Sequence, residues 1–343
     1  MTMFDCHKEM SAFHGEKVTL AQSQRQAMHD RRNSGRTRLE KGLGRDGHPL
    51  PDHHSQGSYA MHTMVQDADN EYDIDDGAYF KEGDLVDADG RALTPREAKE
   101  RVRDALAQDQ RMANDAEVHR NCVRQPYPQG YHIDIPVYRT FVDIDSHGGK
   151  TTKHELASEN AWELSDARKV TRWFQDHVAN AGDNAKQLRK VVRLTKFYAR
   201  SRKDWKERTG SGIMISRLVC DEFVPAKDRD DQSLRDTWEK VHARLKRSLV
   251  VEHPVGETPL AKEGDAKAAF LRDKLAEALD TLLVLDDEPT RGEARAAWDE
   301  TFATSFFSRQ PSPSNGGGGG NKSRVVVSTE ALDRRDDGGG RFG

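Results

Sequence analysis

The chain has 343 residues, 35% hydrophobic and 33% charged, with a formal net charge of −4; it can form one large domain or two moderate ones and gives no sign of a nucleic-acid coat or a membrane-surface protein. Cys6, Cys122 and Cys220 are odd in number and widely spaced, which fits a reducing cytosol and argues against a disulfide framework or a zinc site. No apolar run suits a signal peptide or a membrane span, so we expect a cytoplasmic protein with no membrane partner.

The first half of the chain predicts a polar helix followed by a small mixed sheet. Residues 1–18 have no clear period, and Thr19 with Gln22 forms a capping box that begins a helix to about Leu43. Residues 44–56 predict a loop. The remaining elements are a short helix or turn over 58–65, a strand over 71–79, an acidic loop over 81–90, a helix over 94–113, and two strands over 118–124 and 131–138 that can pair as a hairpin.

From about residue 158 onward, apolar residues recur at helical spacing and predict an all-helical region. Helices are expected after Ser165, over 184–207, over 234–249, over 268–282 and after Thr290. The five glycines at 316–320 predict a flexible tail. This order indicates an α+β protein, which we divide into an N-terminal segment (1–18), a sheet lobe (19–155), a helical lobe (156–307) and a tail (308–343).

Two aspartates in the strand over 71–79 carry the first functional signal. Side chains alternate between faces along a strand, so Asp73 and Asp75 project to one side while Ile74 points to the other. Two carboxylates about 7 Å apart repel each other unless a cation lies between them, and oxygen ligands suit Mg²⁺. A turn at Gly57-Ser58 would let backbone and a hydroxyl approach a triphosphate. Together these parts predict a nucleotidyl-transfer site.

A third acid strengthens this interpretation. Asp134 lies in a His-Ile-Asp-Ile-Pro segment, opposite an apolar face, and it meets the first two carboxylates if its strand pairs beside theirs. Three clustered carboxylates can hold two metal ions for in-line phosphoryl transfer. One alternative is a surface strand that ends at the Asp-Gly turn of residues 76–77. Another is a metal phosphoesterase built on the Asp-His-His triplet at 52–54; that motif should follow a buried strand, whereas here it follows a predicted loop.

These motifs resemble those of the cGAS/DncV-like nucleotidyltransferases of bacterial anti-phage (CBASS) systems, and most closely the DncV-type cyclic dinucleotide synthases. The resemblance covers about residues 16–305 and is carried by residues 56–58, 72–79, 132–138, 187–196 and 210–216. The Gly-Ser, Asp-x-Asp and later Asp set is shared by the wider polymerase-β-like superfamily. The resemblance therefore implies a polymerase-β-like lobe, a mixed sheet with flanking helices, plus a C-terminal helical lobe.

By this resemblance, Asp73, Asp75 and Asp134 are the catalytic residues and the ligands of two Mg²⁺ ions, which Mn²⁺ can replace. Asp134 would also assist deprotonation of the attacking 3′-hydroxyl. Met61 stands where the closest relatives carry a base-stacking aromatic residue, which leaves base preference open. The nucleotide-binding residues implied by the resemblance are Gln56, Gly57, Ser58, Arg124, Arg193, Lys196 and Ser211.

A strongly basic stretch between Lys186 and Arg208 contains two of these residues. Such a run is either a solvated helix face or a face that neutralises triphosphate charge. Arg193 and Lys196 fall within the matching motif, and we therefore expect them to face the nucleotide.

The expected activity is attack of a 3′-hydroxyl on the α-phosphate of a nucleoside triphosphate with release of pyrophosphate, repeated to close a ring. ATP and GTP are the expected substrates, 3′,3′-cGAMP is the first choice of product, and a downstream effector would read it during anti-phage defence. The alternatives are a linear nucleotidyltransferase acting on RNA, protein or a small molecule, and a catalytically idle nucleotide-sensing module. The resemblance also implies conjugation of the C-terminal Gly343 by a ubiquitin-ligase-like partner; no stable nucleic-acid partner is expected.

Overall fold

The computed structural model describes residues 3–67, 72–109, 112–128, 130–256 and 258–311. The chain forms two compact units. The helical unit takes the described residues of Met1–Leu20, His177–His253 and Thr258–Gly343, and the sheet unit takes those of Ala21–Asp176 and Pro254–Glu257. The N-terminal segment thus groups with the helices, and the sheet unit continues some twenty residues past the division expected at 155/156.

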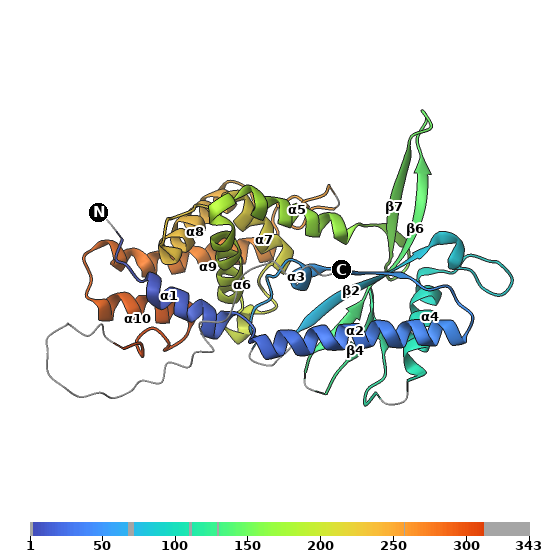
Figure 1. The fold of residues 1–343 in the computed structure, drawn as a ribbon. Helices are drawn as coiled ribbons and strands as arrows, with labels where there is room; N and C mark the ends of the chain where they lie inside the picture. The colour runs from blue at the N-terminus through green and yellow to red at the C-terminus, as the bar shows by residue number, and fades with distance from the viewer. Residues whose placement is uncertain (1–2, 68–71, 110–111, 129, 257, 312–343) are drawn as a thin grey trace. The chain divides into compact units, whose positions relative to one another are not determined.

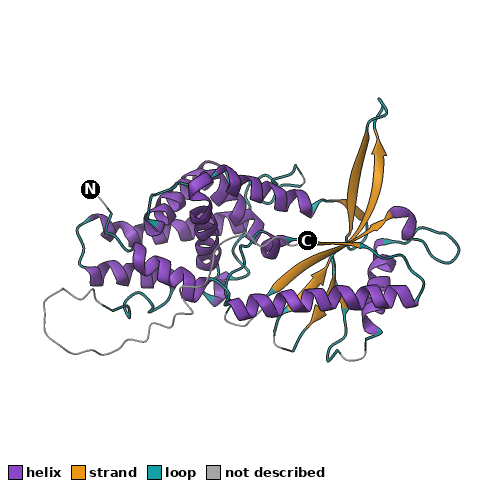
Figure 2. Cartoon of the chain, viewed as in Figure 1, coloured by secondary structure: helices purple, strands orange, loops and turns teal. Residues whose placement is uncertain are grey.

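The sheet unit combines strands and helices (Figures 1 and 2). Helix α5, Ala167–Asn180, then runs from this unit into the helical unit. The other elements are α2 (Gln22–Arg45), β1 (Asp52–Ser55), α3 (Gly57–Ala60), β2 (Asp73–Lys81), a 3₁₀ turn (Glu82–Asp84), α4 (Pro95–Ala107), β3 (Glu117–Val118), β4 (Val123–Pro126), β5 (His132–Ile135), β6 (Val137–Ile144), β7 (Lys150–Ala157) and β8 (Trp162–Leu164).

Strand β2 is the centre of a mixed sheet. The described strands pair in the order β3-β4-β5-β2-β6-β7-β8, with β1 added to β2. Strands β5 and β6 both pair parallel to β2 with the same sequence offset, so they follow one another along it. Pro136 separates them, because proline has no backbone N–H for the ladder, but its carbonyl still accepts from Ala78 N at 2.9 Å.

Helix α2 covers one face of this sheet, and α4 packs against α2. The helices approach closely at Gly42, where an added methyl would overlap the backbone carbonyl of Ala105. Lys99 of α4 is buried, and its ammonium donates to three backbone carbonyls: His119 at 3.1 Å, Arg120 at 2.6 Å and Ser158 at 3.0 Å. This one side chain therefore ties α4 to the β3–β4 turn and to the end of β7.

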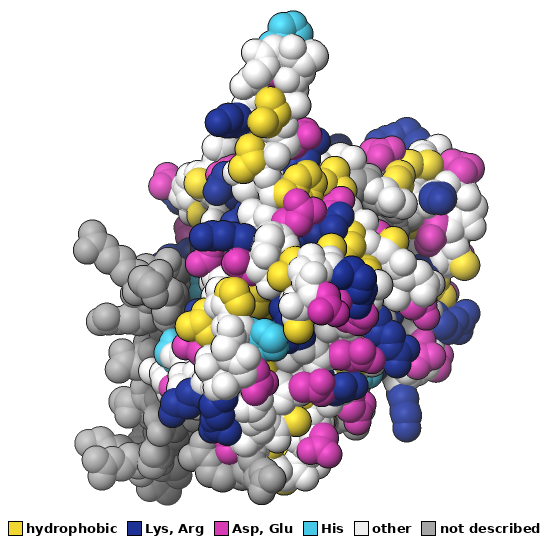
Figure 3. Space-filling view, turned by 90° about the vertical axis from the view of Figure 1, so that its right-hand side faces the viewer, with side chains coloured by type: hydrophobic (Ala, Val, Ile, Leu, Met, Phe, Trp, Pro, Cys, Tyr) yellow, Lys and Arg dark blue, Asp and Glu magenta, His cyan; other side chains and the backbone are white. Residues whose placement is uncertain are grey.

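The outer part of the β6–β7 hairpin projects from the sheet, because β2 pairs with β6 only as far as Thr140 and β8 reaches back only to Glu155. Val142 and Ile144 there are 56% and 60% exposed. Figure 3 shows the hairpin as the projection at the top, with hydrophobic side chains along it.

The helical unit is built around a cluster of aromatic rings. Phe13 lies with its ring centroid 4.8 Å from those of both Phe302 and Phe307, which explains why the N-terminal segment belongs to this unit. Its elements are α1 (His7–Phe13), a π-helical turn (His14–Val18), α6 (Ala185–Ala199), a 3₁₀ turn (Lys203–Trp205), α7 (Gly212–Glu222), α8 (Asp230–Arg247), α9 (Ala266–Leu282), a 3₁₀ turn (Leu283–Asp286) and α10 (Arg291–Phe302). No helix in the described ranges is long and apolar enough to cross a membrane.

The α+β class and a mixed sheet with flanking helices are confirmed, as are helix starts at Thr94 and Thr290, where each threonine forms a capping box. The predicted cap of α2 is wrong: the Gln24 side chain accepts from Ala21 N, and the Thr19 hydroxyl bonds to carbonyls of the preceding π-helical turn. Other boundaries also differ from the prediction. The loop over 44–56 contains β1, the all-helical region begins only after β7 and β8, and the helix over 184–207 ends at Ala199. Helices α1 and α7 were not predicted.

Candidate active site

The parallel pairing of β2 with β5 brings the predicted acids together. Asp75 is the direct register partner of Asp134, and Asp73 is the partner of His132. Ile74, Ile133 and Ile135 are buried on the α2 side of these strands, so alternation places all three carboxylates on the opposite face.

Two of the three carboxylates have cationic or imidazole neighbours. Arg124, the register partner of Asp134 on β4, donates to it through Nε at 2.8 Å and Nη2 at 2.7 Å. His132 Nε2 lies 2.5 Å from Asp73 Oδ1. Asp75 lies between these pairs, and burial followed by the charges of Asp134 and Asp73 raises its pKa from 3.8 to about 7. Negative charge at Asp75 is therefore costly without a further cation.

This donor set fits a divalent cation, because Mg²⁺ prefers carboxylate oxygens and keeps several waters. In the described part of the chain, however, no three His, Cys, Asp or Glu side chains are gathered closely enough to hold one ion. Arg124 engages both oxygens of Asp134, which accounts for the lack of a ready-made three-acid cage. The three acids are adjacent, but Asp134 is paired with Arg124 and Asp73 with His132.

The Gly57-Ser58 turn lies directly over Asp75. Gly57 has φ +61°, and a methyl group there would collide with the Asp75 carboxylate; only glycine fits both the conformation and the space. Ser58 is half-buried in α3, and its carbonyl accepts from Thr63 N at 2.9 Å. Met61 is 4% exposed, so it offers no open surface to a base.

Gln56, which the sequence assigned to nucleotide binding, is 3% exposed. Its Nε2 donates to the Tyr79 hydroxyl at 3.2 Å, and its Oε1 accepts from the Tyr138 hydroxyl at 3.1 Å. Sequence reasoning did not identify these two tyrosines as partners of Gln56, although they lie at the ends of two of the matching motifs.

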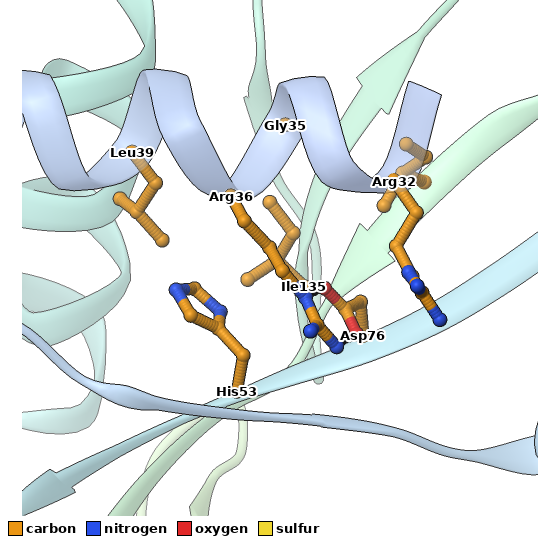
Figure 4. Close-up of a pocket in the computed structure, with 8 residues that line it drawn as sticks. Arg32, Gly35, Arg36, Leu39, His53, Asp76 and Ile135 are labelled. Atoms are coloured by element: carbon orange, nitrogen blue, oxygen red, sulfur yellow. Dashed lines mark hydrogen bonds and ion pairs between the residues drawn. The ribbon is translucent and has the colours of Figure 1, made fainter. Parts of the chain in front are cut away.

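The α2 face of the same strand carries a separate polar cluster (Figure 4). Asp76 points toward α2, where Arg36 donates to it through Nε at 2.7 Å and Nη2 at 2.5 Å and the Ser55 hydroxyl donates at 3.0 Å. The Asp76 side chain is 4% exposed and that of Arg36 is 26% exposed, so the carboxylate is buried and the guanidinium is partly open to solvent. Arg32 adds a bond to Ser55 Oγ at 3.0 Å. Sequence reasoning missed this cluster, although Asp76 directly follows the Asp-x-Asp motif.

The Asp-His-His triplet belongs to β1, which corrects the loop predicted over 44–56. His53 lies within 3.3 Å of Glu40 and its side chain is only 8% exposed. Burial lowers the pKa of His53. Cys122 and Cys220 are buried, and burial raises the pKa of each thiol to about 12.

The other predicted nucleotide ligands belong to the helical unit. Lys196 is 4% exposed, and burial, followed by the charge of Arg200, lowers its pKa to about 7. Its ammonium approaches Gly212, and the neighbouring Ser211 hydroxyl caps α7 by accepting from Met214 N at 3.3 Å. Arg193 Nη1 lies 3.1 Å from His14 Nε2. Gly343 lies outside the described residues.

Comparison with known proteins assigns the class first. Residues 51–138, which include β1, β2, β5 and the three acids, match the family described as "Cyclic GMP-AMP synthase DncV-like, nucleotidyltransferase domain". This stretch is similar to that nucleotidyltransferase domain. The chain is accordingly similar to the DncV-like nucleotidyltransferases, as the resemblance had implied.

Individual relatives agree with this assignment. A cyclic GMP-AMP synthase of Escherichia albertii is 26% identical over 249 residues, which are 69% of this chain but 52% of that protein, so the chain spans about half the relative's length. Vibrio cholerae DncV in complex with the linear intermediate pppA(3′,5′)pG has TM-score 0.67 at 16% identity, covering 88% of this chain and 96% of that one. Escherichia coli DncV with 3′-deoxy GTP has TM-score 0.64 at 17% identity, covering 86% and 97%.

Proposed function

We propose that this protein is a Mg²⁺-dependent cyclic dinucleotide synthase, with ATP and GTP as substrates and 3′,3′-cGAMP as the first candidate product. The observation that carries the proposal is the side-by-side pairing of Asp75 and Asp134 beneath the Gly57 turn. The nucleotides held by the related V. cholerae and E. coli enzymes support the substrate class. A role in anti-phage defence and conjugation at Gly343 remain predictions from the resemblance.

In the proposed reaction, a 3′-oxygen forms a bond to the α-phosphorus while the bond from that phosphorus to the β-bridging oxygen breaks. Pyrophosphate leaves with the electron pair, and the hydroxyl proton passes to a carboxylate, for which Asp134 is the candidate. Mg²⁺, held by Asp73, Asp75 and Asp134, would supply Lewis-acid stabilisation of the triphosphate and of the attacking hydroxyl.

The chain's own residues have definable tasks in this scheme. Asp134 can hold a cation or take a proton only after Arg124 releases at least one of its oxygens. The Gly57 turn lets backbone approach Asp75 closely, which would leave room for a triphosphate beside this acid. Arg193, Lys196 and Ser211 stay predicted nucleotide-binding residues of the helical unit.

The test is incubation of the purified protein with Mg²⁺ and labelled nucleoside triphosphates in all pairs, followed by phosphatase treatment and mass spectrometry. A cyclic product resists phosphatase because it has no terminal phosphate, whereas a linear product is degraded. The double variant Asp73→Asn, Asp75→Asn should lose all product, and Asp143→Asn, an acid on the outer hairpin, should keep it. Activity that survives the double variant would contradict the proposal, and so would Mg²⁺-dependent nucleotide binding without turnover.

A further inference from the structure

A buried amide lies across the strand that carries the acids. The Gln56 side chain rests on β2 at Gly77, where an added methyl would collide with its Nε2. Gly77 is two residues from Asp75, so both share one strand face. Gln56 thus fills the space between the Asp75 carboxylate and Tyr79, the next side chain on that face.

Two stacked tyrosines fix this amide. Tyr79 and Tyr138 are register partners on β2 and β6, and their rings stack with centroids 4.3 Å apart and planes 4° apart. Both are buried, and burial raises the pKa of each phenol, so both hydroxyls stay protonated. The Tyr79 hydroxyl accepts from the amide and the Tyr138 hydroxyl donates to it. Loss of these bonds would destabilise the protein, because the buried amide would be left without partners.

The backbone of Gln56 connects this amide to the acidic strand. Gln56 N donates to Asp75 O at 2.8 Å, and the next residue is Gly57 in its left-handed conformation over the Asp75 carboxylate. The turn that follows is closed by Met61 N to Gly57 O at 3.1 Å and Thr63 N to Ser58 O at 2.9 Å. One residue therefore connects the tyrosine pair, the acidic strand and the Gly-Ser turn.

We propose that Gln56 is a positioning residue that contacts no nucleotide: the tyrosine pair holds its amide, and the amide holds the Gly57-Ser58 turn in register with Asp75. This inference rests on the proposed function and replaces the nucleotide-binding role expected for Gln56. A side chain that is 3% exposed and bonded at both ends of its amide would have to leave its place to reach a ligand.

The experiment is a double-mutant cycle of Gln56→Leu and Tyr138→Phe, read as kcat and KM for each nucleoside triphosphate and as binding of Mg²⁺ with α,β-methylene-GTP. The matched control is Tyr127→Phe, which removes a hydroxyl bonded to Arg38 on the α2 side of the same unit. We expect KM to rise about tenfold for Tyr138→Phe and up to about 100-fold for Gln56→Leu, because small misplacements of a binding group cost this much. The double variant should be no worse than Gln56→Leu, since both changes break one constraint.

Hydrogen exchange gives a readout that does not need activity. The amides of Met61 and Thr63 should exchange faster in both variants and remain at wild-type rates in Tyr127→Phe. A strong effect of Gln56→Leu with none from Tyr138→Phe would identify Gln56 as a direct ligand and overturn the proposal. If Gln56→Leu lowered kcat at unchanged KM, and only in proportion to the fraction of unfolded protein, Gln56 would serve stability alone. That result would also overturn the proposal. If the wild type neither binds nor converts nucleotides, the proposed function fails, and unchanged exchange rates would separately refute the positioning of the turn.

Discussion

Replacing Asp75 by Asn should stabilise the metal-free protein at alkaline pH while it abolishes nucleotidyl transfer. The Asp75 carboxylate is buried beside Asp134 and Asp73, and its pKa is raised from 3.8 to about 7. Asparagine keeps the shape of the side chain but carries no charge to bury. The same feature that suits this position to a cation therefore weakens the fold when no cation is bound.

The size of the effect follows from the pKa. A change from 3.8 to about 7 corresponds to roughly 4 kcal/mol, since each tenfold change in a protonation equilibrium is worth about 1.4 kcal/mol. The folded protein keeps this proton up to about pH 7, while the unfolded chain releases it near its ordinary pKa. Protonated Asp75 therefore causes no loss of stability below about pH 4, and stability is lost as the pH rises to about 7. The free energy of unfolding of Asp75→Asn, relative to wild type, should consequently increase by about 2 kcal/mol between pH 5.5 and 8.5.

The assay is denaturant unfolding of EDTA-treated wild type, Asp75→Asn and the exposed-acid control Asp143→Asn at these two pH values. Addition of Mg²⁺ should shrink the difference between wild type and Asp75→Asn at pH 8.5, because a bound cation stabilises only the ionised carboxylate. An equal difference at both pH values, or a variant less stable than wild type at pH 8.5, would refute this account of the site.

Four further substitutions, one of them a matched control, test the surrounding fold by denaturant unfolding. Gly42→Ala should lower the free energy of unfolding by about 2 kcal/mol or more, because its methyl overlaps the backbone of α4. Gly44→Ala, with nothing within 4 Å, should raise it by up to about 1 kcal/mol through helix propensity, and a loss in both would show that the close approach is not the cause. Lys99→Met should cost about 3 kcal/mol because three backbone carbonyls lose their donor; a change below about 0.5 kcal/mol would contradict that role. Arg36→Ala should cost about 3 kcal/mol by leaving the buried carboxylate of Asp76 with the Ser55 hydroxyl but without its cation, and a variant as stable as wild type would contradict this role of Arg36.

The acids could be predicted from the sequence because strand alternation is a local rule and needs no partner. Asp73 and Asp75 share a face whatever β2 pairs with, and the apolar residues around Asp134 indicated which of its faces is buried. The partners could not be predicted in this way. Arg36 and Tyr138 meet Asp76 and Gln56 only after segments far apart in the chain have paired.

The missed strands have a similar explanation. β1 is four polar residues held by pairing with β2, and β8 is three residues at the sheet edge. The outer half of β7 is exposed on both faces, so it lacks the apolar alternation that marks a half-buried strand. The cap of α2 was predicted wrongly because the Thr19 hydroxyl donates to carbonyls of the preceding π-helical turn and is not used to cap α2.

Two adjacent acids, Asp75 and Asp76, point to opposite faces of β2, so a slip of the strand by a single residue would exchange them. The guanidinium of Arg36 pairs only with the second, and this pairing leaves the first carboxylate for the proposed chemistry. An insertion or deletion within the loop before β2 can be absorbed outside the strand. One inside the strand would turn Asp75 into a counter-ion for α2, and the proposed activity would be lost with the sheet intact.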